Sequence, residues 1–241
     1  MSKTALQPKP ENTAKGKWWD EGVTLVDGCT GKIRCNEHLL KRFENKNGRF
    51  FAIWNDLFHS HVPRQFIFDV IKVIRENKQH TFQILTKRIK RASHVFRILK
   101  ANYAILPNAW LGISASTQKE LDEGVPYLRK TPATVRFLSF EPLLGDTWYH
   151  FPKEIGWVII GAESGSNRRE CKNEWIANIV RQCKFQGTPV FVKQIHLNGK
   201  VCKDIDIIER VIGIKNLNDN RKERLHNDKA CNTAGYGWGM R

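Results

Sequence analysis

Short apolar runs, rich in β-branched and aromatic residues, recur along the chain, and each is followed by polar or ionisable residues. The seven runs are residues 23–26, 50–54, 81–85, 109–113, 135–139, 157–161 and 189–193. Strands that are buried on both faces of a parallel sheet have this continuous apolar character. The runs therefore predict parallel strands whose carboxyl ends, where function gathers in such sheets, carry the polar residues.

Segments with helical periodicity fill most of the gaps between these runs. They are residues 66–77, 88–100, 117–129 and 173–186. Pro63 is well placed to open the first helix, Asn173 to cap the last and Gly187 to end it, whereas Pro126 is expected to break the third. The alternation of strands and helices predicts an α/β fold, a partial or complete (β/α) barrel with mostly parallel strands.

The pattern divides the chain into three expected parts. Residues 1–17 are predicted to form a flexible basic arm, and residues 18–203 the barrel-like domain. Residues 204–241 form a basic C-terminal extension, expected to be disordered or to become ordered on a partner. Within this extension, residues 206–214 are apolar enough for one more helix or strand.

The composition predicts a protein that stays inside the cell. No apolar run approaches the roughly 20 residues needed to span a bilayer, and the first residues lack the apolar core of a signal peptide. We therefore expect a cytoplasmic location and no membrane partner. The six cysteines contain no C-x-x-C pair, so reduced thiols are expected rather than a disulfide framework.

The formal net charge of +16 is distributed unevenly along the chain. Residues 1–100 carry 20 Lys/Arg and 9 Asp/Glu, residues 101–166 carry 5 and 7, and residues 167–241 carry 15 and 8. A strong basic bias usually serves phosphate-bearing partners, which predicts binding to nucleic acid or to a ribonucleoprotein. The alternative is that an AT-rich genome has enriched the chain in lysine.

Six separated strings at the predicted strand ends resemble one family in their order and content. They are AIWNDLFHSHVP (52–63), QHTFQILTKR (79–88), NAWLGISAS (108–116), TPATVRFLSFEPLLG (131–145), WVIIGAESG (157–165) and TPVFVKQ (188–194). Together they resemble the phage-associated three-cysteine-motif proteins, a group of largely unknown function that is related to radical-SAM enzymes. The resemblance implies a barrel of the radical-SAM/TIM type.

The same resemblance implies a [4Fe–4S] cluster and S-adenosylmethionine as cofactors, held in the family by a G-C-T sequence and a following C-x-x-C. Gly28, Cys29 and Thr30 match the first part, but the loop with the second and third cysteines is missing. Cys35 and His38 offer a substitute, C-x5-C-x2-H, although both also align with the family segment that follows the loop. Because thiolates are the usual ligands of such clusters, the loss predicts that no cofactor is bound.

The polar residues at the strand ends are the candidate site. Asp56, Glu141 and Glu163 are the candidate acid–base residues. The alternative for Asp56 is to cap the turn into Leu57 and Phe58, and the alternative for the two glutamates is a structural ion pair with Lys87, Arg88 or Lys193. His59 and His61 are either acid–base or metal groups or stabilise their loop. The candidate cofactor-binding residues are Asn55, Asp56, Lys87, Arg88, Ser114, Glu141, Glu163, Ser164, Lys193 and Gln194. The candidate nucleic-acid contacts are Lys87, Arg88, Lys90, Arg91, Trp18 and Trp19.

Three functions are compatible with these observations. The first is a radical-SAM-like barrel that has lost its cluster and binds nucleic acid or a ribonucleoprotein. The second is an active radical-SAM-type enzyme that modifies a nucleic acid or nucleotide, with Cys29, Cys35 and His38 as metal ligands. The third is a decayed phage gene product without a tightly bound ligand.

Overall fold

The computed structural model describes residues 24–26, 33–35, 37, 40, 43, 48–215 and 217. Its centre is a seven-stranded sheet in the order β3-β4-β5-β6-β7-β8-β9. The strands are β3 (Phe50–Ile53), β4 (Thr81–Thr86), β5 (Ala109–Ser114), β6 (Val135–Phe140), β7 (Ile155–Gly161), β8 (Val190–Leu197) and β9 (Lys200–Cys202). Strands β3 to β8 are parallel to their neighbours, and β9 is antiparallel to β8.

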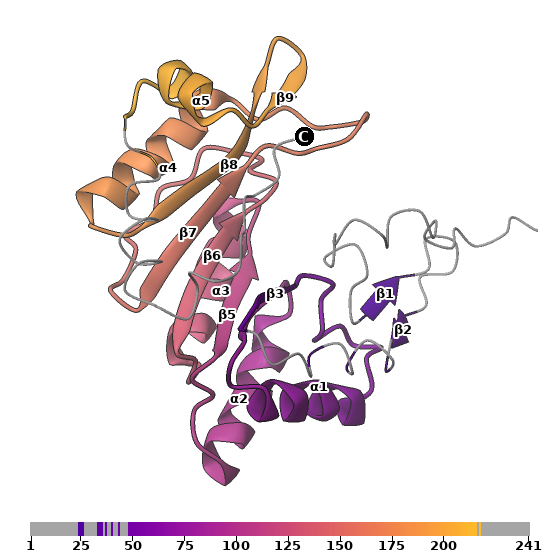
Figure 1. Cartoon of the computed structure of the whole chain (residues 1–241). Coiled ribbons are helices and arrows are strands. Elements are labelled where there is room, and N and C mark those ends of the chain that lie inside the picture. The colour runs from indigo at the N-terminus through magenta and orange to yellow at the C-terminus, as the bar shows by residue number, and fades with distance from the viewer. Residues whose placement is uncertain are drawn as a thin grey trace, which may run out of the picture.

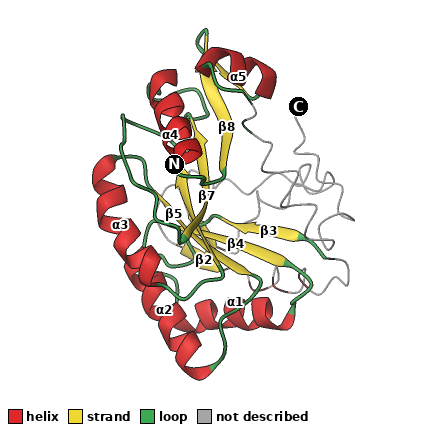
Figure 2. Ribbon diagram, turned by 90° about the vertical axis from the view of Figure 1, so that its left-hand side faces the viewer, coloured by secondary structure: helices red, strands yellow, loops and turns green. Residues whose placement is uncertain are grey.

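Helices follow β3, β4, β5, β7 and β9 and lie on the outer side of the sheet. They are α1 (Arg64–Glu76), α2 (Ile89–Asn102), α3 (Gln118–Lys130), α4 (Asn173–Phe185) and α5 (Ile205–Ile212). The sheet curls so that its inner side is concave, and the helices follow its convex side (Figures 1 and 2). The chain therefore forms a half-barrel of mixed α/β type, which confirms the expected fold class at this level.

The predicted strand at residues 23–26 takes a different place from the one expected. β1 (Thr24–Val26) pairs antiparallel with β2 (Ile33–Cys35), and the two form a separate two-stranded sheet. The other six apolar runs all became parallel strands of the large sheet. A three-residue strand has too few apolar residues to compete for a buried position. Pairing with a strand that is near in sequence also loses less loop-closure entropy.

Two local expectations at the helices need correction, and a third is confirmed. α3 continues through Pro126, which is exposed, instead of breaking there. The cap of α4 is Lys172 rather than Asn173, which is the first residue of the helix and donates its side-chain amide to the carbonyl of His196. Gly187, with φ of 67°, follows the end of α4 as predicted. None of the described helices is long and apolar enough to cross a membrane.

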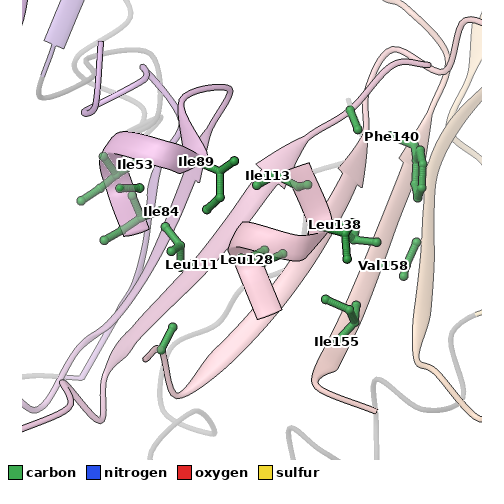
Figure 3. Packing of buried hydrophobic residues seen from close by; sticks show 14 of the residues in the cluster. Ile53, Ile84, Ile89, Leu111, Ile113, Leu128, Leu138, Phe140, Ile155 and Val158 are labelled. Carbon is green, nitrogen blue, oxygen red and sulfur yellow. The ribbon is translucent and has the colours of Figure 1, made fainter. Parts of the chain in front are cut away.

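The main core lies between the sheet and the helices. Aliphatic side chains that point outward from neighbouring strands share one layer, which Ile53, Ile84, Leu111, Leu138 and Val158 exemplify (Figure 3). Ile89 of α2 and Leu128 of α3 close this layer from the helix side. Burying these side chains removes apolar surface from water at roughly 25 cal/mol per Å², which is the main force that holds helices and sheet together.

Gly112 allows a close contact on the opposite, concave face of the sheet. A Cβ atom added there would lie 2.3 Å from ring carbons of Phe137, whose side chain is fully buried on the neighbouring strand. The Phe137 ring therefore lies directly over the Gly112 backbone.

We predict that Gly112→Ala lowers the free energy of unfolding by about 1–3 kcal/mol, because the buried ring has no room to move aside. Urea denaturation measures the change, with Gly145→Ala as the control, since a Cβ at Gly145 meets nothing within 4 Å. In a Phe137→Leu background, Gly112→Ala should lower the free energy of unfolding by a smaller amount. An equal cost in both backgrounds would contradict the proposed contact.

Candidate functional site

The concave face of the sheet carries aromatic, small and charged side chains in successive layers. Alternation along the parallel strands places Gln83 and Trp110 at one level, and Leu85, Gly112, Phe137 and Trp157 at the next. Ser114 and Ser139 follow one level nearer the carboxyl ends. The inner side is thus apolar toward the amino ends of the strands and polar toward their carboxyl ends.

Tryptophan and phenylalanine rings from three strands form a connected group at the apolar end. The Phe50 and Trp110 ring centroids are 5.6 Å apart, and those of Trp110 and Trp157 are 6.2 Å apart, both with the rings nearly perpendicular. Phe137 lies 6.2 Å from Trp157. Phe50, Trp110 and Trp157 are only partly buried, whereas aliphatic residues on the other face of the same strands are fully buried.

At the carboxyl ends, Glu141 and Lys193 form an ion pair across β6 and β8. Lys193 Nζ lies 3.0 Å from Glu141 Oε1, and the Ser139 hydroxyl donates to the other carboxylate oxygen. Gly161 lies beneath this carboxylate, because a Cβ there would be 2.9 Å from Glu141 Oε1. The structure therefore brings together two of the predicted site residues, and a third predicted position, Ser114, lies one strand away.

Lys193 also connects the two ends of the parallel sheet. Its ammonium lies 4.8 Å from the centroid of the Trp54 ring, which follows β3. The Trp54 indole N–H donates to Gln83 Oε1 at 3.2 Å. Since β3 and β8 are the first and last parallel strands of the sheet, this contact shows how strongly the sheet curls at its carboxyl edge.

Asp56 has a structural role at the end of β3. Its carboxylate accepts hydrogen bonds from the Thr86 hydroxyl at 2.6 Å and the Lys87 backbone N–H at 3.2 Å, and Arg88 Nη1 lies 2.5 Å from Oδ2. These contacts join the carboxyl ends of β3 and β4. The structure thus gives Asp56 a structural ion pair, which is neither the ligand-binding role nor the capping of the turn into Leu57 and Phe58 that the sequence offered for it.

Glu163 is paired with Arg169 rather than with Glu141 or Lys193. The Arg169 guanidinium donates to both carboxylate oxygens, at 2.9 and 2.7 Å, and its backbone N–H donates at 2.7 Å. These hydrogen bonds lower the pKa of Glu163 to about 2. A carboxylate with so low a pKa is a poor general base at neutral pH.

Other predicted cofactor-binding residues are distributed over the same edge. Gln194 is buried and donates to the Ala162 carbonyl at 2.6 Å, so its amide supports the β7–β8 irregularity. Ser164 is exposed in the loop after β7, and Asn55 is partly buried after β3.

The residues predicted to contact nucleic acid differ in whether their side chains are exposed or already bonded within the protein. Arg91 donates to the carbonyls of Phe58, His59 and Val62, so it holds the loop before α1 in place. Lys87 and Lys90 are exposed, and the Lys90 ammonium lies 5.3 Å from the Tyr127 ring centroid. Trp18 and Trp19 lie outside the described residues.

His59 and His61 stabilise their loop. The backbone N–H of His61 donates to His59 Nδ1 at 3.3 Å, which requires that nitrogen to be unprotonated. Desolvation, with the nearby Arg88 charge, lowers the pKa of His59 and so favours this form. The structure supports the loop-stabilising alternative for this pair.

Of Cys29, Cys35 and His38, the three candidate ligands of an iron–sulfur cluster, the structure describes only Cys35. Within them no group of three or more His, Cys, Asp or Glu side chains is placed to hold a metal ion. Burial, with the Glu37 charge nearby, raises the pKa of the Cys35 thiol. Cys29 and His38 lie outside the described residues.

The sequence reasoning missed the aromatic group and Gln83. Gln83, Trp110 and Trp157 lie within the apolar runs 81–85, 109–113 and 157–161, which predict strands but give these side chains no role in a site. A signal was present, because these runs alternate between aliphatic residues and aromatic or polar residues, as in Trp110-Leu111-Gly112-Ile113-Ser114. Such an alternation indicates a strand whose two faces have different surroundings.

The low pKa of Glu163 gives a prediction about Arg169. In Arg169→Gln the pKa of Glu163 should rise from about 2 toward the ordinary value of 4.5, although the backbone N–H of residue 169 still donates. Because the folded-state pKa is depressed, the pair contributes stability above the ordinary pKa, and that contribution is lost as the pH falls toward 2. NMR titration of the Glu163 carboxyl carbon measures the shift. Arg181→Gln, whose guanidinium contacts Asn178, is the control and should leave it unchanged.

Comparison with known proteins identifies a family for most of this chain. No curated protein and no solved structure matches it. Residues 9–232 match the family described as "Protein of unknown function (DUF5131)". Because this match covers well over half of the sequence, the chain belongs to that family.

Proposed function

We propose that this protein is a partial barrel of the radical-SAM/TIM type that binds nucleic acid or a ribonucleoprotein in the cytoplasm, without an iron–sulfur cluster. The consecutive order of six parallel strands with helices on the convex side supports the barrel type. The resemblance of the strand-end motifs to phage-associated three-cysteine proteins supports the radical-SAM relationship.

One observation carries the nucleic-acid proposal. The three acids expected at the carboxyl edge are each paired with a cation, namely Asp56 with Arg88, Glu141 with Lys193 and Glu163 with Arg169. These pairs neutralise the negative charge that would otherwise repel a phosphate backbone. The exposed Lys87 and Lys90 then add positive charge beside this edge, in a chain whose net charge is +16.

A radical-SAM-type enzyme that modifies a nucleic acid or nucleotide is the second candidate. The Glu141–Lys193 pair favours it, since a partly buried acid and amine at the mouth of a half-barrel can orient a substrate. Its cluster would have to be held by Cys29, Cys35 and His38, or by a thiol of a partner. A third possibility, a decayed phage product without a tight ligand, predicts no thermal stabilisation by nucleotides, S-adenosylmethionine or nucleic acid.

The first prediction for this function concerns salt. Binding to DNA or RNA should weaken linearly on a log–log scale as salt rises, with a slope of about 0.7–0.9 per phosphate contact. The variant Lys87→Gln/Lys90→Gln should show a shallower slope in fluorescence anisotropy titrations. Lys78→Gln/Lys130→Gln is the matched control, because both of these exposed lysines lie near the amino ends of the strands. Binding that is absent or independent of salt would refute the proposal.

The second prediction separates the binding protein from the enzyme. Protein purified without oxygen should be colourless and contain no stoichiometric iron or sulfide. Metal and sulfide analysis before and after reconstitution measures this. If instead the protein takes up a cluster that the variants Cys29→Ala and Cys35→Ala lose, the enzyme hypothesis is correct.

A further inference from the structure

We propose that the concave face binds a base of single-stranded nucleic acid, packed against the rings of Trp110 and Trp157 and contacted by Gln83, with Lys193 positioned for a phosphate of the same strand. This inference rests on the proposed function and assigns it a specific site. The evidence comes from three features of the concave face.

The first feature is aromatic surface that the fold leaves partly uncovered. Phe50, Trp110 and Trp157 are half-buried, whereas Ile84 and Leu111, on the helix side of the same sheet, are 0% exposed. Rings of this size normally contribute to a core, so their exposure on a concave surface leaves apolar area for a planar ligand to cover. Nucleobases are planar, and stacking on aromatic side chains is how proteins bind them without regard to sequence.

The second feature is a buried donor without an acceptor. Gln83 is 1% exposed and lies beside Trp110 on the concave face. Because the Trp54 indole N–H can only donate, its bond to Gln83 fixes which end of the amide is oxygen. The Gln83 Nε2 group then has no hydrogen-bond partner. An unsatisfied buried donor destabilises the free protein, and a base carbonyl or ring nitrogen is an acceptor that would satisfy it.

The third feature is the charge at the mouth of this surface. Lys193 is 29% exposed, contacts Glu141 at 3.0 Å and lies over the Trp54 ring, so its ammonium is held in place. One of its three N–H groups serves Glu141, which leaves donors for a phosphate oxygen. The rings lie toward the amino ends of the strands and the cation lies at their carboxyl ends, so a strand whose base covers the rings can place one of its phosphates at Lys193.

The occupant is a single strand because the rings lie on the inner side of a curled sheet. In a duplex the base faces are stacked on one another, and stacking them on protein would require extrusion of a nucleotide. An unpaired strand presents its base faces directly. The chemistry is shared with a free nucleotide, so the test includes both.

The decisive experiment compares a short single-stranded oligonucleotide with the same strand made abasic at its centre, using the full-length protein. Wild-type protein should bind the intact strand about tenfold more tightly than the abasic strand, and its tryptophan fluorescence should be quenched. Trp110→Leu should lose this preference while keeping the salt slope, because the phosphate contacts remain. Trp110→Phe should retain most of it, which shows that the ring rather than the fold is responsible.

Trp148→Leu is the matched control, since Trp148 is 77% exposed and lies outside the concave face. It should bind both strands as the wild type does. Gln83→Leu should weaken binding of the intact strand several-fold but not of the abasic strand. A purely structural Gln83 would instead show equal losses for both strands.

The outcomes separate this inference from the proposed function. If intact and abasic strands bind equally and salt still weakens both, the base site is wrong and the nucleic-acid function stands. If no strand binds at any salt concentration, the proposed function fails, and titration with nucleoside monophosphates then tests the site alone. Quenching that Trp110→Leu abolishes would support a nucleotide site; no quenching would overturn it.

Discussion

The constraint on which the structure depends is that the helices pack on the convex side of the curled parallel sheet. Aliphatic residues such as Ile84, Leu111 and Leu138 are buried there, and they supply most of the apolar contact between the layers. The concave side of β3 to β8 has no helix among the described residues. Packing against helices therefore does not determine the side chains on this concave side. This explains why one face of a strand carries aliphatic residues and the other carries aromatic, small and polar residues.

Ion pairs at the carboxyl edge follow from the same geometry. Parallel strands bring all of their carboxyl ends to one edge, so acids and bases that are far apart in sequence meet there. Asp56 reaches Arg88, and Glu141 reaches Lys193, which lies 52 positions later. Each pair leaves the carboxyl edge locally neutral. The net charge of this edge is therefore determined by the remaining lysines, which make it positive.

The sequence predicted the six parallel strands and four of the helices, because long apolar runs and helical periodicity are local signals. It did not predict β9, although Asn198 and Gly199, both with positive φ, are a common hairpin turn. It also placed residues 23–26 in the main sheet, since the pairing of so short a strand is not encoded in its own residues. Within the site, the partners of Asp56 and Glu163 depend on tertiary distances that no spacing reveals.

The aromatic group shows why a continuous apolar run is an incomplete description of a strand. In Trp110-Leu111-Gly112-Ile113-Ser114, the aliphatic residues face the helices, and the tryptophan, glycine and serine face the concavity. A strand covered equally on both sides has no reason to separate side chains in this way. Gly112 accommodates the Phe137 ring from the next strand. Ser114 places a small polar side chain one level nearer the carboxyl ends of the strands. The alternation therefore separates a helix-facing side from a concave side, and the partly exposed rings on the concave side are the surface that the proposed base would cover.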